Sequence, residues 1–336
     1  MAPMQMDSSI KADAPVVLDV HDLQVCFPTR EGIVTALDGL SMQVSPGEII
    51  GLVGESGCGK STAALSFMRL VPKPGKITAG QILIEGQDIL KLGPSEMRTL
   101  RGPSVAMIFQ DALTALDPRM PVGRQIMEPL QIHQHLSSRA ARARAIELLA
   151  SVGIPAPEKR FSQFPHEFSG GMRQRAMIAL ALSCSPRLLL ADEPTTALDV
   201  TVQRQIMSLI KRMRDETDAA IILITHDVGV VAEMCDQVIV MYAGSAVETG
   251  PTRTVFTRPT HPYTIGLLSS TLELTRDRSL PLNAIPGLPP ELIHLPSGCV
   301  FAPRCPRVGD ACREARPVLE PVESGHQVSC WRWKEG

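Results

Sequence analysis

The chain has 336 residues, of which 44% are hydrophobic, and its 33 Lys and Arg against 35 Asp and Glu give a formal net charge of −2. This length exceeds the size at which one hydrophobic core usually keeps growing, so we expect two domains. The near-neutral charge offers no broad electrostatic attraction to nucleic acid or to anionic lipid.

The N-terminal segment has neither a basic start nor an apolar stretch of signal-peptide length. Nowhere does the sequence contain the roughly 18–20 consecutive apolar residues that cross a bilayer. We therefore expect the chain to work in the cytosol or docked on a membrane from the cytosolic side. Structural disulfides are improbable in that reducing compartment.

The first part of the chain predicts short strands, with one helix among them. Strand-like runs occupy Val16–Phe27 and Met42–Val53, with turn signals between them. The run EIIGLVG, residues 48–54, leads through a glycine-rich turn into a helical pattern, STAALSFMRLV, at 61–71. GQILIEGQDI, residues 80–89, predicts a strand pair joined by a glycine turn.

The second part predicts helices followed by buried strands. Residues from about 120 to 185 carry apolar positions at helical spacing. The continuous apolar runs at 187–194 and 219–227 suit parallel strands that are covered on both faces. Residues 237–250 predict a hairpin, and proline becomes frequent beyond Thr257, which indicates a linker into a small, core-poor tail.

The segment GESGCGKS, residues 54–61, matches the pattern G-x-x-x-x-G-K-[ST] between a predicted strand and a predicted helix. In this pattern backbone N–H groups and the helix N-terminus face phosphate oxygens, Lys60 reaches the β- and γ-phosphates, and Ser61 ligates Mg²⁺. The alternative is a glycine-rich turn that only joins strand to helix. The pattern predicts that the chain binds a nucleoside triphosphate through Gly54, Glu55, Ser56, Gly57, Cys58, Gly59, Lys60, Ser61 and Thr62.

Two acidic residues end the buried run LLLADEP, residues 188–194. We expect Asp192 to hold Mg²⁺ through its water shell and Glu193 to orient or deprotonate the attacking water. The alternative is an acidic pair that caps the next helix. His226, at the end of the next apolar run, is a candidate contact for the γ-phosphate or the water, although a single His here is more often structural.

The segment FSGGMRQR, residues 168–175, resembles the signature of ATP-binding-cassette (ABC) ATPases, whose usual form is LSGGQ. Gln110 in MIFQD resembles the Q-loop of that family, TALD at 196–199 its D-loop, and His226 its switch histidine. The resemblance covers residues from about 20 to 255. The alternative for SGG alone is a flexible helix N-cap.

The resemblance implies specific roles. Ser169, Gly170 and Gly171 start a helix and would bind the γ-phosphate of ATP held by the opposite subunit, so that two cassettes dimerise head to tail. Phe168 and Met172 replace the usual Leu and Gln of the signature. The nucleotide would also contact Phe27, which stacks on adenine or else belongs to the core, and Asp199 of the D-loop. The residues implied for Mg²⁺ are Ser61, Gln110 and Asp192.

The whole sequence is similar to the ATP-binding subunits of oligopeptide and dipeptide permeases. The stretches that carry this resemblance are 168–175, 188–203, 241–250, 258–268, 285–290 and 295–306. Within that group the signature and the 191–203 region look more like the D-type subunit than its F-type partner. The segment 111–120 departs from the more usual DPMTSLNP-like form. Nickel and other peptide-like solutes are the alternative substrate class.

The resemblance implies a peripheral subunit on the cytoplasmic face of the inner (plasma) membrane. Its partners would be a second, F-type ABC ATPase, two transmembrane permease subunits and, indirectly, an extracytoplasmic binding protein. Gln110 and the helices after it would receive a coupling helix of the permease. An isolated chain would hydrolyse ATP slowly, because half of each site belongs to the partner.

The predicted fold class is α/β: a P-loop ABC nucleotide-binding domain, with a mixed sheet core, an antiparallel β subdomain and a helical subdomain, plus a small Cys- and Pro-rich C-terminal domain. We expect an N-terminal tail at 1–15, the nucleotide-binding domain at 16–256 and the C-terminal extension at 257–336. The helical subdomain is expected at about 112–185.

Two other classes of function compete with this prediction. An ABC ATPase that acts on nucleic acid or the ribosome would carry a coiled-coil insertion, tandem cassettes or a basic face, and the sequence has none of these. A regulatory module that binds ATP without cleaving it would not need both Glu193 and His226. We therefore expect an ATPase, with ATP and Mg²⁺ as its ligands and no nucleic acid partner.

Four of the eight cysteines lie near the end of the chain, spaced C-x5-C-x6-C-x17-C. This spacing lacks the C-x2–4-C pairs of zinc sites and the common ferredoxin runs, so it leaves a metal site and small buried hydrophobes equally open. The small, proline-rich tail favours a metal site, because a tail with so little core needs a cross-link to hold one shape. Resemblance to related permease subunits implies a 4Fe–4S cluster, with zinc as the alternative, on Cys299, Cys305, Cys312 and Cys330.

Overall fold

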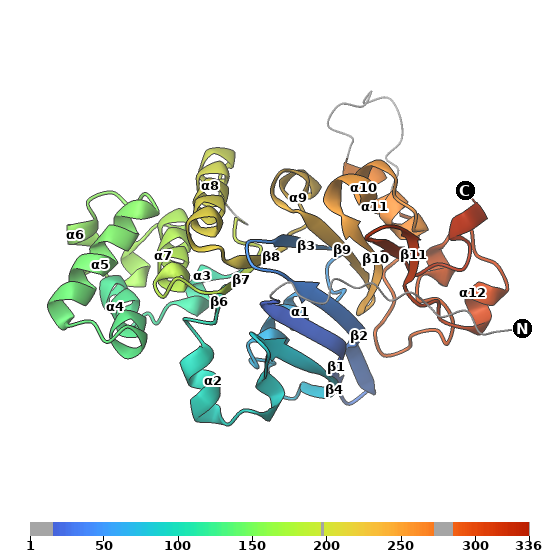
Figure 1. Ribbon diagram of the computed structural model, residues 1–336, viewed down its shortest axis with the longest axis horizontal. Coiled ribbons are helices and arrows are strands. Elements are labelled where there is room, and N and C mark those ends of the chain that lie inside the picture. Colours follow the sequence, from blue (N-terminus) through green and yellow to red (C-terminus); the bar gives the residue numbers. More distant parts are fainter. Residues whose placement is uncertain (1–15, 196–197, 272–284, 336) are drawn as a thin grey trace, which may run out of the picture.

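The computed structural model describes residues 16–195, 198–271 and 285–335 and has the expected α/β architecture (Figure 1). The predicted N-terminal tail, 1–15, and Thr196 and Ala197 of the TALD segment lie outside the described residues. The strands are β1 (Leu18–Pro28), β2 (Ile33–Val44), β3 (Ile49–Val53), β4 (Lys76–Ile84), β5 (Gln87–Asp88), β6 (Val105–Ile108), β7 (Leu188–Asp192), β8 (Ala220–Ile224), β9 (Gln237–Tyr242), β10 (Ser245–Pro251), β11 (Glu320–Glu323) and β12 (His326–Val328). The helices are α1 (Lys60–Phe67), α2 (Pro94–Leu100), α3 (Ala112–Ala115), α4 (Val122–His133), α5 (Ser138–Ser151), α6 (Pro157–Arg160), α7 (Gly170–Leu182), α8 (Val200–Thr217), α9 (Val228–Met234), α10 (Thr252–Thr257), α11 (Pro262–Thr271) and α12 (Ala311–Glu314).

The central sheet has eight strands in the order β11-β12-β10-β9-β3-β8-β7-β6. Its strands β9, β3, β8, β7 and β6 pair in parallel, whereas β10, β11 and β12 join antiparallel. The carboxyl ends of the parallel strands therefore meet at one edge, which is where open α/β sheets bind their ligands.

Alternate residues of the parallel strands face two different cores. In β3, Ile49 and Val53 belong to the core on the helical side, whereas Ile50 and Leu52 belong to the core on the side of the second sheet. Every residue of β3, β7 and β8 is buried. Coverage on both faces explains why these strands have continuous apolar sequences rather than alternating ones.

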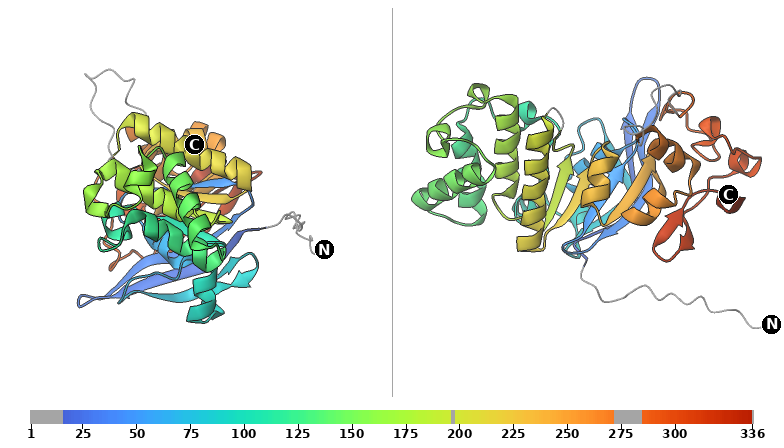
Figure 2. Two further views of the ribbon diagram at one scale, coloured as in Figure 1. Left: turned by 90° about the vertical axis from the view of Figure 1, so that its left-hand side faces the viewer. Right: turned by 90° about the horizontal axis from the view of Figure 1, so that it is seen from above.

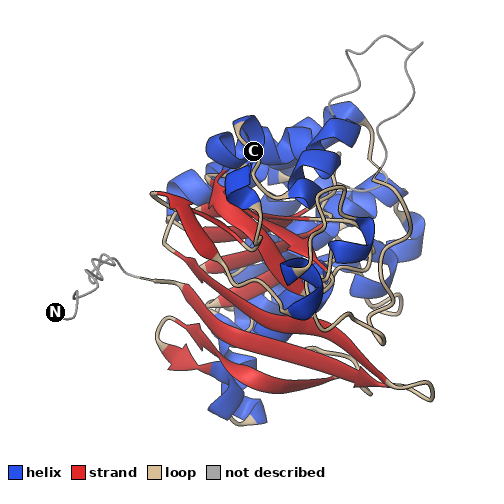
Figure 3. Ribbon diagram, turned by 90° about the vertical axis from the view of Figure 1, so that its right-hand side faces the viewer, coloured by secondary structure: helices blue, strands red, loops and turns tan. Residues whose placement is uncertain are grey.

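The second sheet is antiparallel, with the order β2-β1-β4-β5. Its β1–β2 and β1–β4 pairings contain register shifts, which bend the strands. Figure 3 shows the strands of both sheets from the end of the molecule that carries the C-terminal region. The mixed central sheet and this separate antiparallel sheet confirm the predicted fold class.

Helices α3 to α7 gather at one end of the molecule and the C-terminal region lies at the other (Figures 1 and 2). The helix predicted at 61–71 ends earlier, at Phe67, because Arg69 takes a left-handed φ of 50°. Within the described residues, none of the helices combines the length and the apolar character that a membrane span requires.

The C-terminal region shares the sheet and the core of the rest of the chain. Strand β12 pairs with β10, so the central sheet runs on into the tail. Val300 and Phe301 are buried in the same cluster as Ile49 and Val53 of β3. The apolar residues of the tail thus complete the central core, which holds in place a tail that has little core of its own. The domain boundaries stay a prediction.

A buried carboxylate joins the tail to the central sheet. Glu248 of β10 is fully buried and accepts hydrogen bonds from the backbone N–H groups of Thr260, at 2.7 Å, and His261, at 2.9 Å. Its Oε1 also lies 2.8 Å from Nε2 of His326 in β12, which is 1% exposed. These contacts fix the start of α11 and the tail hairpin against β10.

We predict that Glu248→Ala destabilises the protein, because removal of one partner from a buried pair leaves uncompensated polar groups, at a cost of about 3–5 kcal/mol. Thermal unfolding measures the loss, and limited proteolysis is expected to show earlier cleavage in the tail. The control is Glu320→Ala, an exposed carboxylate of β11, whose removal should change stability by less than about 0.5 kcal/mol. Equal unfolding temperatures for the two variants would contradict the assigned role.

Candidate nucleotide-binding and hydrolysis site

The loop from Gly54 to Gly59 joins the end of β3 to the start of α1. Gly54 has a φ of 153°, and a Cβ placed on it would lie 2.3 Å from the carbonyl oxygen of Met241 in β9. Gly59 has a φ of 106°, and its Cβ would lie 2.5 Å from the carbonyl oxygen of Ala36 in β2. Only glycine fits at these two positions, because the backbone is left-handed and a neighbouring strand approaches closely.

Lys60 lies inside the curl of this loop. Its Nζ donates hydrogen bonds to the carbonyl oxygens of Gly54, at 2.8 Å, and Glu55, at 2.9 Å, and it lies 3.5 Å from Sγ of Cys58. Burial raises the pKa of the Cys58 thiol, although the Lys60 ammonium opposes the rise. The loop thus holds a cation at its centre and a neutral thiol beside it, which suits the binding of phosphate.

Asp192 ends β7 next to the loop and is 4% exposed. Burial raises the pKa of its carboxyl, a hydrogen bond with the Ser61 side chain lowers it, the charge of Glu193 raises it and Lys60 lowers it. Its Oδ1 is buried without a hydrogen-bond partner. A buried carboxylate oxygen without a partner, beside a hydroxyl, is a donor set that fits Mg²⁺.

Three polar side chains meet where β6, β7 and β8 end. Nε2 of Gln110 donates to Oε2 of Glu193 at 3.0 Å, and Nδ1 of His226 lies 3.3 Å from Oε1 of the same carboxylate. Glu193 has a φ of 46°, which is strained for a residue with a side chain. The backbone N–H of Glu193 donates to the carbonyl oxygen of Ile224 at 2.9 Å, a bond that holds this conformation.

A cavity of about 540 Å³ connects the loop to these three side chains. Phe27 of β1 forms part of its wall, and the ring of Phe27 is covered on one side by Gly75. The cavity therefore runs from an aromatic ring to the carboxylate of Glu193, an extent that suits a bound nucleotide. It is lined by Phe27, Val34, Ala36, Gly54, Ser56, Gly57, Gly59, Lys60, Ser61, Thr62, Gln110, Glu193, His226 and Leu292.

The signature residues lie outside this cavity. Ser169 caps the N-terminus of α7, and its hydroxyl accepts a hydrogen bond from the N–H of Met172 at 3.3 Å. Ser169 and Gly170 are exposed, and no described residue of the 168–175 segment lines the cavity. The helix is nevertheless tied to the segment that follows β7, because Nε2 of the buried Gln174 donates to the carbonyl oxygen of Pro194 at 2.8 Å.

The D-loop residue Asp199 is the N-cap of α8, where its Oδ1 accepts from the N–H of Val202 at 2.9 Å. Asp199 is not among the residues that line the cavity. The structure thus brings together Gln110, Asp192, Glu193, His226 and the loop, and it leaves Asp199 and the signature apart from them.

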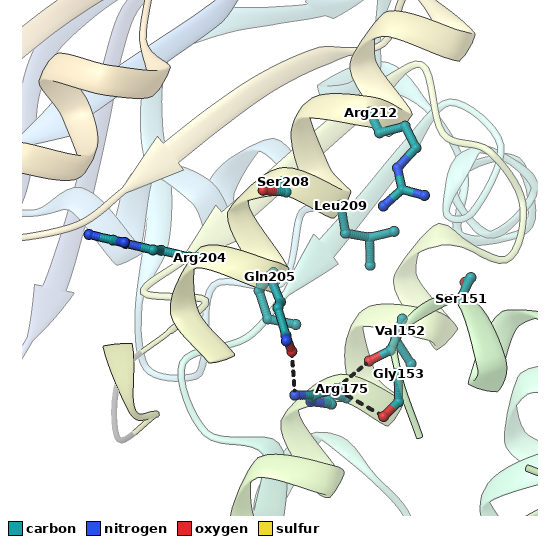
Figure 4. Close-up of a pocket in the computed structure, with 10 residues that line it drawn as sticks. Ser151, Val152, Gly153, Arg175, Arg204, Gln205, Ser208, Leu209 and Arg212 are labelled. Carbon is teal, nitrogen blue, oxygen red and sulfur yellow. Dashed lines mark hydrogen bonds between the residues drawn. The ribbon is translucent and has the colours of Figure 1, made fainter. Parts of the chain in front are cut away.

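A second cavity, of about 480 Å³, lies between the end of α5, α7 and α8 (Figure 4). Arg175, from the signature segment, points across it and donates to the carbonyl oxygens of Val152 and Gly153 and, at 2.9 Å, to Oε1 of Gln205. These bonds set the distance between α7 and α8. None of the nucleotide-site residues lines this cavity, so it is not the nucleotide site.

The four C-terminal cysteines lie close to one another. The backbone N–H of Cys299 donates to the carbonyl oxygen of Cys312 at 2.8 Å. Burial, opposed by a hydrogen bond with the backbone of Phe301 and aided by the thiols of Cys312, Cys330 and Cys305, raises the pKa of the Cys299 thiol to about 11. Even so, across the described residues no group of three or more His, Cys, Asp and Glu side chains stands ready to hold a metal ion.

Sequence reasoning missed three residues of the C-terminal region that reach the nucleotide site. Leu292 lines the cavity, the hydroxyl of Tyr263 accepts a hydrogen bond from the N–H of Glu55 at 2.7 Å, and Arg304 forms an ion pair with the Glu55 carboxylate. A single Arg in a proline-rich stretch carries no local signal of such a contact, because its partner lies 249 positions away.

Comparison with protein families matches two segments. Residues 37–196 match the family described as ABC transporter. Residues 247–312 match the family described as oligopeptide/dipeptide transporter, C-terminal region. The second match includes the start of the tail and three of its four cysteines.

Similar proteins extend over nearly the whole chain. A probable peptide ABC transporter ATP-binding protein of Sinorhizobium fredii is 50% identical, with 99% of each chain covered. The oligopeptide transport ATP-binding protein OppD of Salmonella typhimurium is 49% identical, with 95% of this chain and 94% of the relative covered. Among solved structures, the dimeric bacterial ABC transporter cassette MJ0796 is 28% identical with a TM-score of 0.64. The match covers 70% of this chain and 99% of the MJ0796 chain.

We predict that Gly54→Ala weakens Mg·ATP binding by at least about tenfold, because the new methyl group would displace the loop from the Met241 carbonyl. Titration of the full chain with a fluorescent ATP analogue measures the change. Gly86→Ala is the matched control, since Gly86 also has a positive φ, of 78°, but no atom within 4 Å of the new methyl group. Unchanged binding by Gly54→Ala would refute the steric argument.

Proposed function

The chain belongs to the ABC transporter ATP-binding proteins of the oligopeptide/dipeptide type, and on that premise we propose that it hydrolyses ATP to energise a peptide importer. The observation that best supports hydrolysis, rather than binding alone, is that Gln110 and His226 both contact the carboxylate of Glu193 beside the phosphate loop. A cassette that only held ATP would not need this arrangement.

Glu193 is the proposed general base. In the hydrolytic step a water oxygen bonds to the γ-phosphorus, the bond from that phosphorus to the β,γ-bridging oxygen breaks, ADP leaves, and the water proton passes to Glu193. The side chain of Glu193 is 17% exposed and that of His226 71%. Glu193 thus lies partly shielded within the site, while His226 remains free to respond to a bound phosphate.

The proposed Mg²⁺ ligands are Ser61 and Asp192, with Gln110 as a further contact. Their support is the buried Oδ1 of Asp192, which has no hydrogen-bond partner, and the Ser61 side chain, which lowers the pKa of the same carboxyl. When bound, the ion neutralises charge on the β- and γ-phosphates. Lys60 would contribute to the same neutralisation once phosphate competes with the carbonyl oxygens of Gly54 and Glu55 for its ammonium.

A second cassette is proposed to complete the site. The N-terminus of α7, at Ser169 and Gly170, is exposed and faces no nucleotide site of its own chain, which is the arrangement expected if it binds ATP held by a partner. The proposed partner is an F-type ATPase. Two permease subunits and an extracytoplasmic binding protein complete the assembly, with this chain at the cytoplasmic face of the membrane.

The proposed cycle is a shift between open and closed dimers. ATP contacts both cassettes only when they are closed, so its higher affinity for the closed state supplies the free energy for closure. Hydrolysis and phosphate release remove that bridge and reopen the dimer. The permease subunits change conformation with the dimer, because they contact it at Gln110 and the helices that come after it.

We predict that Glu193→Gln retains Mg·ATP binding and loses about 100-fold or more of the ATPase activity of the assembled transporter, because loss of a general base typically costs this much. Phosphate release assays and nucleotide titration measure the two properties. Glu216→Gln, an exposed carboxylate of α8, is the control and should leave both unchanged. Undiminished turnover by Glu193→Gln would exclude Glu193 as the base.

The C-terminal cysteines are proposed to hold a 4Fe–4S cluster, with zinc as the alternative. The support is their chemistry: four thiols, partly or fully buried and close enough to raise the pKa of Cys299. No group of metal-binding side chains stands ready in the described residues, so the thiols would have to turn toward one centre. A bound cation would also favour the thiolates of Cys299, Cys305 and Cys330, whose pKa values burial raises.

We predict that anaerobically purified protein is brown and contains about four iron atoms per chain, and that Cys305→Ser combined with Cys312→Ser abolishes the iron. Iron analysis and the visible absorption spectrum measure this. Cys26→Ser, in β1, is the control and should retain the iron. Colourless protein that contains zinc would support the alternative, and protein free of both metals would exclude a metal site.

A further inference from the structure

The side chain of Arg304 links the C-terminal region to the phosphate loop. It ends the short 3-10 turn Ala302–Arg304, directly before Cys305. Its Nη1 and Nη2 donate to the two carboxylate oxygens of Glu55 at 2.6 and 3.0 Å, which makes the ion pair bidentate. The side chain of Arg304 is 6% exposed and that of Glu55 is 24% exposed, so solvent screens this pair far less than a surface pair.

Arg304 is itself held in place. Its Nε donates to the carbonyl oxygen of Pro286 at 2.9 Å, and its Nη1 donates to the hydroxyl of Tyr242 at 3.3 Å. Tyr242, Tyr263 and Phe301 pack against one another with ring centroids 4.6 to 5.5 Å apart. The guanidinium therefore sits in a rigid frame, built by β9, α11 and the tail together.

Glu55 is fixed at three points. Arg304 holds its carboxylate, the hydroxyl of Tyr263 accepts its backbone N–H at 2.7 Å, and Lys60 donates to its carbonyl oxygen at 2.9 Å. Two of these three contacts come from residues beyond 257. The second residue of the phosphate loop is thus held chiefly from outside the loop.

The charges give this contact a direct consequence for ATP. Glu55 places a carboxylate in a loop that must accept a polyphosphate, and an unpaired carboxylate there would repel the ligand. Arg304 neutralises that carboxylate and draws it toward the tail. Removal of the guanidinium would leave the carboxylate partly buried and uncompensated next to the phosphate site.

We propose that Arg304 is a positioning residue for ATP: through Glu55, the C-terminal region holds the phosphate loop in its binding conformation and cancels the charge that would oppose the phosphates. Arg304 does not line the nucleotide cavity, so it acts through Glu55 and not on the ligand. This inference rests on the proposed ATP-binding function.

The test uses the full chain and Mg·ATP. Arg304→Met is expected to raise the Kd for a fluorescent ATP analogue and the KM for ATP by about tenfold, while kcat at saturating ATP stays within about twofold, because loss of uniform binding changes KM alone. Arg304→Lys should recover part of the affinity, since an ammonium pairs with one carboxylate oxygen but cannot reproduce the bidentate contact. Affinity equal to wild type in a folded Arg304→Met protein would overturn the proposal.

A double variant shows whether Arg304 acts through Glu55. Combining Glu55→Gln with Arg304→Met removes the uncompensated carboxylate, so the double variant should bind ATP more tightly than Arg304→Met alone. A merely structural role of Arg304 would predict no recovery, and that result would overturn the proposal.

Two further variants guard against ambiguity. If Arg304→Met does not fold, Tyr263→Phe tests whether the C-terminal region holds Glu55, because it keeps the ring and removes the acceptor for the Glu55 N–H. We expect a several-fold rise in the Kd for the ATP analogue. Wild-type affinity would overturn the proposal. Arg258→Met breaks an exposed ion pair with Glu323 inside the C-terminal region and should leave Kd unchanged. Loss of binding in Arg258→Met as well would mean that any disturbance of the tail weakens ATP binding, against a specific role for Arg304.

Lys60→Ala distinguishes a failure of the proposed role of Arg304 from a failure of the proposed ATP binding. It removes the ammonium at the centre of the loop and should abolish binding. If wild type and Lys60→Ala bind the analogue equally, the assignment of ATP itself fails. If only Lys60→Ala loses affinity while Arg304→Met does not, ATP binding stands and the role of Arg304 fails.

Discussion

The parallel register between β3, β8 and β7 determines where the chemistry of this protein can occur. Because Val53, Ile224 and Asp192 end adjacent strands at one edge of the sheet, the phosphate loop, His226 and Glu193 must emerge side by side. Burial on both faces prevents these strands from slipping, since a shift of one residue would exchange the residues that face the two cores. The site is thus a consequence of how the core packs.

That constraint also explains why so much of the site could be predicted from the sequence. The run of apolar residues before GESGCGKS and before ADEP indicated buried strands, and polar residues at the ends of such strands are expected to meet. The contacts of Glu193 with Gln110 and His226 follow from this logic. The left-handed conformation of Glu193 could not be predicted in this way. Its φ of 46° is set by the hydrogen bond from its N–H to the carbonyl oxygen of Ile224 and not by local preference.

The C-terminal region was the least predictable part for a physical reason. Its proline content suggested a linker, and its apolar residues are too few for an independent core. Those residues instead pack into the core of the central sheet, where Phe301 meets Tyr242 and Tyr263. Pairings over such separations, like that of Arg304 with Glu55, depend on the completed fold and leave no periodic pattern in the sequence.

The tail hairpin has a further consequence for the sheet that it joins. Strand β12 covers the backbone of β10, which would otherwise be an open edge of the central sheet, and β11 becomes the outermost strand. That strand is four residues long and contains Pro321 and two carboxylates, Glu320 and Glu323, features that discourage a further strand from adding. The hairpin therefore protects the protein from edge-to-edge aggregation, and a chain that ended after β10 would offer neighbouring molecules a template for strand addition.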